Sequence, residues 1–510
     1  MRLFTTIAGL RSAIDRQRQD RTIGLFPTMG ALHSGHSLAI ERAVKENDIV
    51  VVSIFVNPLQ FGPNEDLDQY PRQLETDCQL CERLGVKLVF APTTAELYEH
   101  KPTVAVVPPT QMISVLCGQF RAGHFEGVAT IVTKLLNIVQ PTTAYFGEKD
   151  AQQLAIVRRL IADLNIPVEI KAIPIVREAS GLAYSSRNQY LTPEEKQRAL
   201  ILSRSLQEAQ KFFESGVRDA LELIGIVKQK LTRESQVKVQ YVELVHPDTL
   251  KPLEKIEEVG LLAIACFVGS TRLIDNVILR SRAPIIAIDG PAGAGKSTVT
   301  RRIARNLDLL YLDTGAMYRA VTWLVMGSEI SLSDEPTIAE LVSKAKIELI
   351  PDDSWEFPTS VKINGEDVTR AIRSPQVTAN VSAIAAMVSV RQQLVKQQQR
   401  WGDRGGVVVE GRDIGTNVFP DAELKIYLTA SVGERAKRRA KEFKDTQQQE
   451  IDIEQLKKEI QQRDDRDSKR QIAPLKKASD AIEINTDGLT IEEVVQQVIS
   501  LYEQKFSSKT

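Results

Sequence analysis

The chain has 510 residues, too many for one ordinary domain, and its composition of 43% hydrophobic and 26% charged residues is typical of soluble globular proteins. Its 65 basic and 66 acidic side chains nearly cancel and leave a formal net charge of −1. This balance excludes a global basic field for nucleic acid and an acidic tail, so no nucleic-acid partner is expected.

The first residues of the chain lack the pattern of a secretory signal. No long apolar run occurs over 1–12, and Arg11, Asp15 and Arg16 introduce charge early. The most apolar stretch, 260–269, is too short to cross a bilayer and is typical of a buried strand. We therefore expect a cytoplasmic protein without a membrane partner.

Four cysteines are present, at positions 78, 81, 117 and 266. Cys78 and Cys81 form a C-x-x-C in a helix-like stretch, but no second pair of ligands is spaced to complete a zinc site. Free thiols in a reducing compartment are the expected state.

Strands and helices are predicted to alternate over the first part of the chain. Short apolar runs at 22–27, 49–56, 87–90 and 144–146 have the length and composition of buried strands, and a helical pattern separates the first two. This alternation is typical of a parallel, doubly wound α/β sheet.

A His-Ser-Gly-His segment follows the first predicted strand. His33 and His36 flank a Ser-Gly pair at the point where a helix is expected to begin. Imidazoles and backbone N–H groups at a helix start can bind ATP phosphates and stabilise the charge of departing pyrophosphate. Such segments occur in class I aminoacyl-tRNA synthetases and in nucleotidyltransferases; an ordinary turn with two histidines is the alternative.

The pattern changes near residues 177–190. A long amphipathic helix is predicted over 194–216 and a second from about residue 218. Three clustered strands follow at 237–245, 260–268 and 272–279. Clustered elements predict a small α+β subdomain over about 177–279, after a core over 1–176.

A short polar segment that ends in Pro284 separates the two halves of the chain, which we place at 1–279 and 280–510. A buried strand is predicted directly after it, at 285–288. In the second half, a β-rich insert is expected at about 345–370. Further strands are expected at 407–409, 424–428 and 481–484.

The segment Gly-Pro-Ala-Gly-Ala-Gly-Lys-Ser at 290–297 is a complete P-loop, placed between a predicted strand and a predicted helix. Its glycines let backbone N–H groups surround phosphates, Lys296 neutralises charge on the transferring group, and the Ser297 hydroxyl would ligate Mg²⁺. ATP with Mg²⁺ is therefore the predicted cofactor, and Lys296 is a predicted catalytic residue. The ATP-binding residues predicted here are Gly290, Gly293, Gly295, Lys296, Ser297 and Thr298.

Longer segments narrow the function of the first half. They are Phe-Val-Asn-Pro-Leu-Gln-Phe at 55–61, Arg-Ala-Gly-His-Phe-Glu-Gly at 121–127, Tyr-Phe-Gly-Glu-Lys-Asp-Ala-Gln-Gln at 145–153, Ser-Ser-Arg-Asn at 185–188 and Thr-Arg-Leu-Ile-Asp-Asn at 271–276. All resemble pantothenate synthetase, that is, pantoate–β-alanine ligase, over roughly residues 1–279. The resemblance implies a Rossmann-like nucleotidyltransferase fold and usually a homodimer through this half.

The resemblance also implies a two-step reaction. The pantoate carboxylate attacks the α-phosphate of ATP to give pantoyl adenylate and pyrophosphate, and the β-alanine amine then displaces AMP. His36 would be the proton donor or charge stabiliser, with His33 and Lys149 also catalytic, and Gln60 and Gln153 would hold pantoate. The implied ATP site comprises Met29, Gly30, Ala31, Leu32, His33, Ser34, Gly35, His36, Gly147, Glu148, Lys149, Asp150, Val176, Tyr184, Ser185, Ser186 and Arg187.

One departure from that family lies in the mobile loop. The family often has Asp-Gly-Leu-Ala-Met before Ser-Ser-Arg, whereas this chain has Ser180 and Tyr184 at the two ends of that segment. The change puts the loop's grip on the nucleotide in question. His100, His124 and His246 are expected to be structural or surface residues.

Three segments of the second half carry a different resemblance: 312–319 (Leu-Asp-Thr-Gly-Ala-Met-Tyr-Arg), 411–415 (Gly-Arg-Asp-Ile-Gly) and 463–470 (Arg-Asp-Asp-Arg-Asp-Ser-Lys-Arg). They resemble the P-loop nucleoside monophosphate kinase fold, and specifically bacterial cytidylate kinase, over about 284–505. The implied substrate is CMP or dCMP. The residues implied around it are Asp313, Thr314, Arg319, Arg391, Arg412 and Asp413, with Arg463, Asp467 and Arg470 in a lid.

Two alternatives to a bifunctional enzyme remain at this stage. One half is a degenerate binding module, although Lys296, Ser297, His36 and Lys149 are all present. The other alternative, an aminoacyl-tRNA synthetase fragment, predicts a basic tRNA surface and an anticodon domain, for which the sequence gives no sign.

Overall fold

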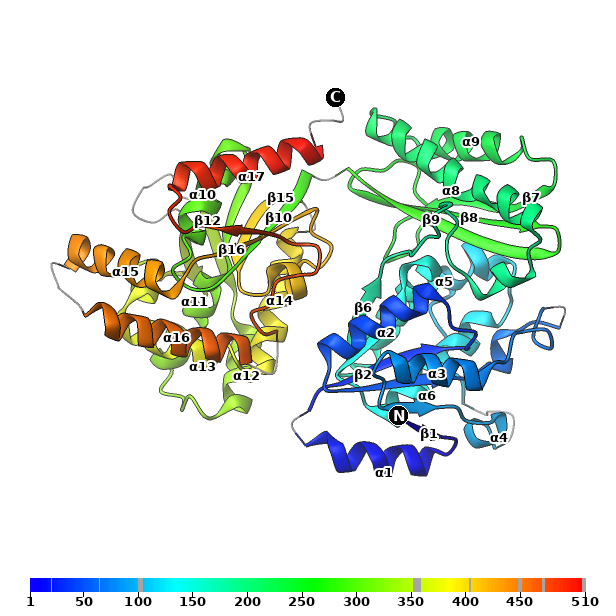
Figure 1. The fold of residues 1–510 in the computed structure, drawn as a ribbon, viewed down its shortest axis with the longest axis horizontal. Helices are drawn as coiled ribbons and strands as arrows, with labels where there is room; N and C mark the ends of the chain where they lie inside the picture. The colour runs from blue at the N-terminus through cyan, green and yellow to red at the C-terminus, as the bar shows by residue number, and fades with distance from the viewer. Residues whose placement is uncertain are drawn as a thin grey trace. The chain divides into compact units, whose positions relative to one another are not determined.

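The computed structural model describes residues 1–19, 21–63, 65–99, 104–281, 283–351, 359–402, 405–447, 452–469 and 473–506. The chain divides into two compact units, Met1–Ser281 and Arg282–Thr510, which are considered one at a time (Figure 1). Among the described helices, none has the length and hydropathy that a bilayer-spanning helix requires.

The first unit contains a parallel sheet with strand order β1-β4-β3-β2-β5-β6. Its strands are β1 (Arg2–Phe4), β2 (Ile23–Thr28), β3 (Ile49–Ile54), β4 (Leu88–Phe90), β5 (Thr143–Gly147) and β6 (Glu169–Ile173). All neighbouring pairs described in it are parallel, which confirms the predicted α/β sheet. The two edge strands were not predicted, because β1 is short and β6 is mostly half-exposed.

Helices cover both faces of this sheet, because β2 and β3 are mostly apolar on both of their faces and need partners on each side. One buried apolar cluster packs α1 (Ile7–Arg18), α6 (His124–Val139) and α7 (Ala151–Asp163) against the sheet. A second cluster packs α2 (Ser34–Glu46) and α3 (Leu74–Arg83) on the other face (Figure 1).

The strand order positions a binding site. Strand β2 pairs with β3 on one side and with β5 on the other. The chain connections from β2 therefore lead to opposite sides of the sheet. Ligands bind at such a switch point, outside the carboxyl ends of the strands. Short connecting helices follow there: η1 (Pro58–Gln60), α4 (Thr94–Leu97), α5 (Thr110–Ile113), η2 (Leu116–Gln119), η3 (Glu148–Asp150) and η4 (Ser186–Tyr190).

The remainder of the first unit is an α+β layer pair. Helices α8 (Pro193–Glu214) and α9 (Ala220–Leu231) pack on an antiparallel sheet with its own apolar cluster. That sheet is ordered β7 (Val237–Val245), β8 (Val259–Val268), β9 (Thr271–Arg280). Both helices and all three strands match the predicted elements to within a few residues.

The second unit has a five-stranded parallel sheet, among its described residues, with order β11-β15-β10-β16-β17. The strands are β10 (Ala283–Asp289), β11 (Leu310–Asp313), β15 (Gly405–Gly411), β16 (Leu424–Thr429) and β17 (Ile482–Asn485). The strand β11 was not predicted, since it has only four residues and only one of them, Leu312, is buried.

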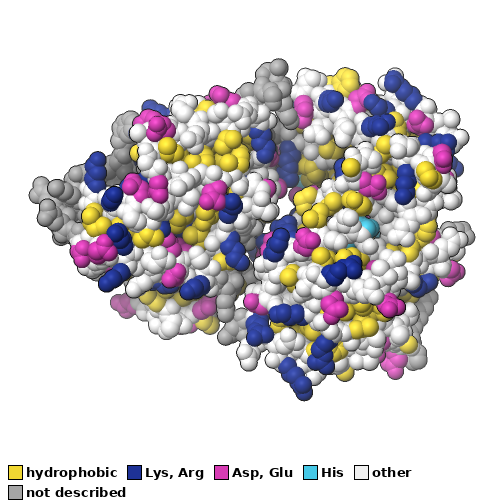
Figure 2. All heavy atoms as spheres, in the orientation of Figure 1, with side chains coloured by type: hydrophobic (Ala, Val, Ile, Leu, Met, Phe, Trp, Pro, Cys, Tyr) yellow, Lys and Arg dark blue, Asp and Glu magenta, His cyan; other side chains and the backbone are white. Residues whose placement is uncertain are grey.

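Helices and a small sheet surround that core. The helices are α10 (Lys296–Asn306), α11 (Thr314–Gly327), α12 (Glu335–Lys344), η5 (Ala371–Arg373), α13 (Pro375–Ile384), α14 (Val388–Gly402), the π-helical turn η6 (Ile414–Val418), α15 (Val432–Gln447), α16 (Ile453–Lys469) and α17 (Ile491–Phe506). The expected β-rich insert contains β12 (Ile347–Pro351), β13 (Thr359–Ile363) and β14 (Glu366–Asp367), paired antiparallel. Figure 2 shows basic and acidic side chains interspersed over the face in view, in keeping with the near-zero net charge.

Candidate functional site

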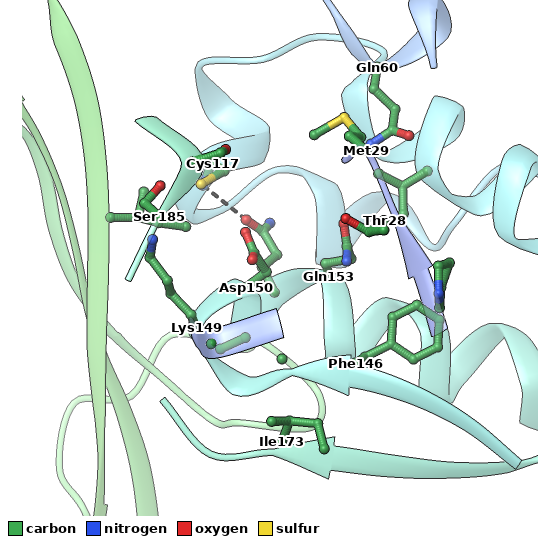
Figure 3. A pocket seen from close by; sticks show the side chains of 18 of the residues that line it. Thr28, Met29, Gln60, Cys117, Phe146, Lys149, Asp150, Gln153, Ile173 and Ser185 are labelled. Atoms are coloured by element: carbon green, nitrogen blue, oxygen red, sulfur yellow. Dashed lines mark hydrogen bonds between the residues drawn. The ribbon is translucent and has the colours of Figure 1, made fainter. Parts of the chain in front are cut away.

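The first unit contains a cavity of about 300 Å³ at the carboxyl edge of its sheet (Figure 3). Its walls come from the segments that follow β2, β3 and β5, together with η4 and β9. The predicted residues that line it are Met29, His33, Gly35, His36, Gln60, Gly147, Lys149, Asp150, Gln153, Val176, Tyr184, Ser185, Ser186 and Arg187. The predicted residues that do not line it are Gly30, Ala31, Leu32, Ser34 and Glu148.

The two histidines form the N-terminal cap of α2. The His33 ring Nδ1 accepts the backbone N–H of Gly35 at 3.2 Å, and the His36 Nδ1 accepts that of His33 at 3.3 Å. The two rings are stacked with centroids 3.9 Å apart. Because each Nδ1 is an acceptor, this network assigns the proton of each neutral ring to Nε2.

Both imidazoles are neutral at pH 7. Burial, with the charge of Lys149, lowers the pKa of His33 to about 4. Burial also lowers the pKa of His36 well below its usual value, with smaller effects of His33 and Lys149. Each ring can therefore offer an Nε2–H hydrogen bond to a phosphate oxygen, but neither holds a spare proton for acid catalysis. Of the two roles expected for His36, this geometry favours the charge stabiliser.

Lys149 lies on η3 and extends toward Ser185 across the cavity (Figure 3). Its ammonium donates to the backbone oxygen of Tyr184 at 2.9 Å. Burial lowers the pKa of Lys149, although the nearby carboxylates of Asp150 and Asp275 oppose the shift. The backbone of η3 is held in place because the Asn276 amide donates to the carbonyl oxygens of Glu148 and Lys149, each at 3.0 Å.

The buried amide of Gln60 is oriented by its neighbours. The Asn57 amide donates to Gln60 Oε1 at 3.0 Å, so the Gln60 N–H groups are directed elsewhere. The Asn57 oxygen in turn accepts from the Tyr98 hydroxyl at 3.0 Å. Gln153 also lines the cavity and is drawn beside Thr28 in Figure 3. The two amides expected to hold pantoate therefore share one cavity.

His124, expected to be a structural or surface residue, lies in the wall of the same cavity and contacts the backbone of Gln60. Its Nδ1 lies 2.7 Å from the backbone oxygen of Gln60, and Arg121 donates to that oxygen at 3.2 Å. Burial lowers the pKa of His124 to about 3. His246 caps an exposed turn by accepting the N–H of Asp248 at 3.2 Å, and His100 lies outside the described residues.

The Ser-Ser-Arg segment forms η4 at the cavity edge. Arg187 makes two hydrogen bonds of 2.9 Å to the Asp66 carboxylate, and the Tyr70 hydroxyl lies 3.1 Å from Ser186 Oγ. The Tyr184 ring, at the position that departs from the family pattern, stacks on His33 with centroids 5.7 Å apart. The loop that carries Tyr184 therefore packs against His33.

The second unit places its P-loop between β10 and α10. Gly290 is required sterically, since an added Cβ would lie 2.0 Å from the backbone oxygen of Leu428 and its φ is +150°. Lys296 is the first residue of α10, and its ammonium donates to the Pro291 carbonyl oxygen at 2.8 Å. Burial, followed by the charge of Arg412, lowers the pKa of Lys296. Ser297 and Thr298 follow on the first turn of the helix.

The residues expected around the monophosphate come from adjacent strand ends and from α14. Asp313 caps α11 by accepting the Ala316 N–H at 3.0 Å, and the Thr314 hydroxyl donates to the Glu410 backbone oxygen at 2.6 Å. Arg391 and Asp413 form a buried ion pair. Arg319 lies one turn further along α11. The fold therefore places the six expected residues on α11 and its cap, on α14 and at the end of β15, where Arg412 directly precedes Asp413.

Two of the predicted lid residues, Arg463 and Asp467, lie on α16. Arg412 donates to Asp467 of α16 at 3.3 Å. Burial, followed by the charge of Arg412, lowers the pKa of Arg463 to about 10. The third predicted lid residue, Arg470, lies outside the described residues. On α15, Arg435, which we did not predict, bonds Asp464 at 2.6 and 3.1 Å and the P-loop carbonyl of Ala292 at 3.2 Å.

Two buried carboxylates beside the P-loop were also missed by the sequence analysis. Asp289 accepts the backbone N–H groups of Ile414 and Gly415 at 2.8 and 2.7 Å, and burial raises its pKa to about 6. Glu410 ends the apolar run of β15 and accepts the Tyr311 hydroxyl at 2.5 Å. Its second oxygen, Oε2, is buried without a hydrogen-bond partner.

This second oxygen bears on the predicted Mg²⁺. Burial and Asp313 raise the pKa of Glu410, while Lys296, Tyr311 and Ser297 oppose the rise. A buried carboxylate that interacts with the Ser297 hydroxyl is the type of ligand that Mg²⁺ prefers. The described residues contain no group of three or more His, Cys, Asp or Glu arranged for a metal, so phosphates and water would have to supply the remaining ligands.

Known proteins match both halves. Residues 2–278 match the family described as Pantoate-beta-alanine ligase, and residues 286–504 match the family described as Cytidylate kinase. A Nostoc sp. protein named "Bifunctional pantoate ligase/cytidylate kinase" is 58% identical, over 99% of this chain and 100% of its own. A Synechocystis sp. protein of the same name is 56% identical, over 99% of each chain.

A solved structure of pantothenate synthetase from Thermus thermophilus is similar to the first half. It is 43% identical, has a TM-score of 0.52, and covers 54% of this chain and 99% of its own. The similarity thus extends to the whole of that enzyme and, in the relatives above, to both halves in one continuous chain.

Proposed function

Because the chain belongs to the family of bifunctional pantoate ligase/cytidylate kinases, we propose which of its residues perform the two reactions and how. One reaction condenses (R)-pantoate with β-alanine at the cost of ATP and releases pantothenate, AMP and pyrophosphate. The other transfers a phosphoryl group from ATP to CMP or dCMP. The observation that carries the proposal is that each half has one cluster of phosphate-binding groups of the kind its reaction requires.

In the ligase half, the start of α2 and Lys149 bind the ATP phosphates. A pantoate carboxylate oxygen attacks the α-phosphorus, the bond to the bridging oxygen breaks, and pyrophosphate leaves. The Nε2–H groups of His33 and His36 and the Lys149 ammonium stabilise the growing negative charge, which is the function of oriented donors in a dry site. The helix N-terminus adds to this field.

Gln60 and Gln153 orient pantoate for this attack. Their neutral amides can bind its hydroxyl and carboxylate oxygens without the strong ion pair that an arginine would form, so the carboxylate stays nucleophilic. The β-alanine amine then attacks the carbonyl carbon of the adenylate. The bond between that carbon and the phosphate oxygen breaks, AMP leaves, and the ammonium proton is lost to solvent.

Pantoate labelled with heavy oxygen in its carboxylate tests this route directly. Attack by the carboxylate leaves one labelled oxygen in AMP and one in pantothenate, because the cleaved bond joins carbon to that oxygen. Mass spectrometry of AMP checks the prediction. Label in inorganic phosphate, with ADP as the second product, would show activation at the γ-phosphate and contradict the assignment.

In the kinase half, the P-loop and Lys296 bind ATP, while the arginines of α11 and α14 and Arg412, directly after β15, bind the monophosphate. A CMP phosphate oxygen attacks the γ-phosphorus, and the bond to the ADP oxygen breaks. Arginines suit the acceptor site because their planar fork grips phosphate oxygens in pairs. Closure of α16 over the phosphates would exclude water that otherwise hydrolyses ATP.

Mg²⁺ would be held by the Ser297 hydroxyl and the Glu410 carboxylate, in addition to ATP itself. When bound, it supplies charge that bridges and neutralises the phosphates. The assignment of cytosine as the base is tested by parallel reactions of γ-labelled ATP with CMP, dCMP and UMP. Label should enter CDP and dCDP; equal kcat/KM for UMP would contradict the choice of base.

A homodimer through the ligase half and a cytoplasmic location complete the proposal. The four cysteines are all free in the structure, which is the ordinary state in a reducing compartment. Sedimentation of the full chain tests the dimer, and a monomer at micromolar concentration would contradict it.

A further inference from the structure

Asp77, on α3, is a buried carboxylate with no part in the reactions described above. Only 1% of its surface is exposed. Its Oδ2 accepts the backbone N–H of Ala31 at 2.9 Å, and its Oδ1 accepts that of Leu32 at 2.9 Å. These donors lie about midway between the end of β2 and the start of α2. A buried carboxylate is stable only when hydrogen bonds compensate its lost hydration, so both contacts are needed.

The segment that Asp77 contacts has an unfavourable backbone conformation. Gly30 has φ +88° and Ala31 has φ +52°, two successive residues in the left-handed region. For a residue with a side chain, such as Ala31, this region costs on the order of 1 kcal/mol and persists only where the surroundings impose it. A Cβ on Gly30 would lie 3.0 Å from Asp77 Oδ2, so the carboxylate packs tightly against the turn.

The same segment sets the position of the phosphate-binding groups. Met29, before the turn, and His33, after it, both line the cavity. His33 is also the cap of α2, and its backbone N–H fixes the ring of His36. A shift of the turn would therefore move both imidazoles relative to ATP.

We propose that Asp77 is a positioning residue for the adenylation step: by binding two successive N–H groups it fixes the left-handed turn that directs His33 and His36 at the ATP phosphates. The inference rests on the proposed function of the ligase cavity. It distinguishes the two half-reactions, because the imidazoles act on departing pyrophosphate, whereas β-alanine attacks a carbonyl carbon after pyrophosphate has left.

The substitution Asp77→Asn tests this role with almost no change in shape. An amide has one acceptor oxygen in place of two, and its NH2 group would face one of the two loop N–H groups. We expect kcat/KM for ATP in pantothenate synthesis to fall about 10- to 100-fold, the range expected from a misplacement near 1 Å. Glu75→Gln is the matched control, since it removes one negative charge from an exposed position of the same helix.

A second measurement separates positioning from a general loss of structure. Synthetic pantoyl adenylate with β-alanine bypasses ATP, and Asp77→Asn should convert it at nearly the wild-type rate. The kinase activity of the same chain gives the amount of chain in each assay, and the adenylate reaction reports whether the ligase half is folded. An unchanged ATP-dependent rate, or an equal loss in both half-reactions, would overturn the positioning role.

The proposed function has a separate test in the same experiment. If wild-type protein forms no AMP from pantoate, β-alanine and ATP, the function assigned to the cavity fails, and the role of Asp77 fails with it. If wild type forms AMP and only the ATP-dependent step responds to Asp77→Asn, both stand.

Discussion

The ATP sites proposed for the two halves use different kinds of donor. The ligase half offers two neutral imidazoles and one buried lysine inside a walled cavity. The kinase half has a P-loop lysine surrounded by arginines, several of which are paired with acids. The difference follows from the chemistry, because the ligase must leave a carboxylate free to attack, whereas the kinase must neutralise a triphosphate and a monophosphate at once.

The acidic partners of the kinase arginines are a second difference between the two halves. Asp467 on α16 binds Arg412, which we propose to contact the monophosphate, and Asp464 on the same helix binds Arg435 beside the P-loop. An arginine that must exchange a carboxylate for a phosphate needs an anion at both positions, since a buried unpaired charge is expensive. The ligase histidines need no such partner because they are neutral.

The largest expected effect is on the kinase activity and comes from Arg435→Ala. The substitution removes the contacts with Asp464 and with the Ala292 carbonyl oxygen, which join the lid helix to the P-loop. We expect the kinase kcat/KM to fall about 100-fold, as for loss of a close, desolvated charge pair, with the ligase rate unchanged. Steady-state assays of both reactions on one preparation check this.

Arg302→Ala is the control for that experiment, since it removes an exposed arginine of the same unit that contacts Glu492 on α17. It should leave both activities near wild type. A similar loss in Arg302→Ala and Arg435→Ala would show that the effect is one of general charge and not of the lid.

The next largest difference is expected in the pH dependence of the two activities. The pKa of Asp289 is raised to about 6 by burial, with repulsion from Asp413 and attraction by Lys296 acting in opposite directions. Below pH 6 the protonated carboxyl loses one acceptor for the Ile414 and Gly415 N–H groups, so kinase activity should decline. The ligase should show no histidine limb in this range, because the pKa of His33 is about 4.

The folding stabilities of the two halves should change in opposite directions as the pH changes. A buried neutral histidine stabilises the fold above its unfolded pKa, and this contribution of up to about 3 kcal/mol for His33 is lost as pH falls from 6.5 toward 4. Asp289 favours the folded state when protonated, so its contribution is lost as pH rises from 3.8 to about 6. Measuring the unfolding of each half separately over this pH range checks these signs.

If the kinase activity of Asp289→Asn still declined below pH 6, the decline could not be assigned to Asp289.

The smallest expected effect concerns Tyr184. Its ring stacks on His33 at the cavity edge, where the resembled family has methionine. Tyr184→Met should change the KM for ATP only about twofold to fivefold, in line with one aromatic contact, and should not affect the kinase. Titration of ATP at saturating pantoate checks this. A loss as large as that of a phosphate-binding residue would mean that the tyrosine binds the nucleotide directly.

The sequence was sufficient for features that are local in the chain. The His-Ser-Gly-His segment and the P-loop are contiguous, and their positions at a strand end and helix start follow from the apolar runs before them. The parallel sheets could likewise be predicted from alternation. The edge strand β6 could not, because only one of its residues is buried and the hydrophobic pattern is weak.

The residues that were missed act across long stretches of sequence. Asp77 binds backbone groups 45 and 46 residues away, and Asp289 binds groups 125 and 126 residues away. A backbone N–H has no residue identity, so no pattern in the sequence marks it as a partner. Glu410 alone carried a signal, as an acid directly after the apolar run of β15 beside the P-loop strand.

Product analysis on the full chain tests the central claim, that two independent active sites share one polypeptide. Wild type, His36→Ala and Lys296→Ala are each given Mg²⁺-ATP with pantoate and β-alanine, or with CMP. AMP and pantothenate should be lost only in His36→Ala, and CDP and ADP only in Lys296→Ala. If either substitution abolishes both reactions, or if wild type lacks one of them, the account of two separate sites is contradicted.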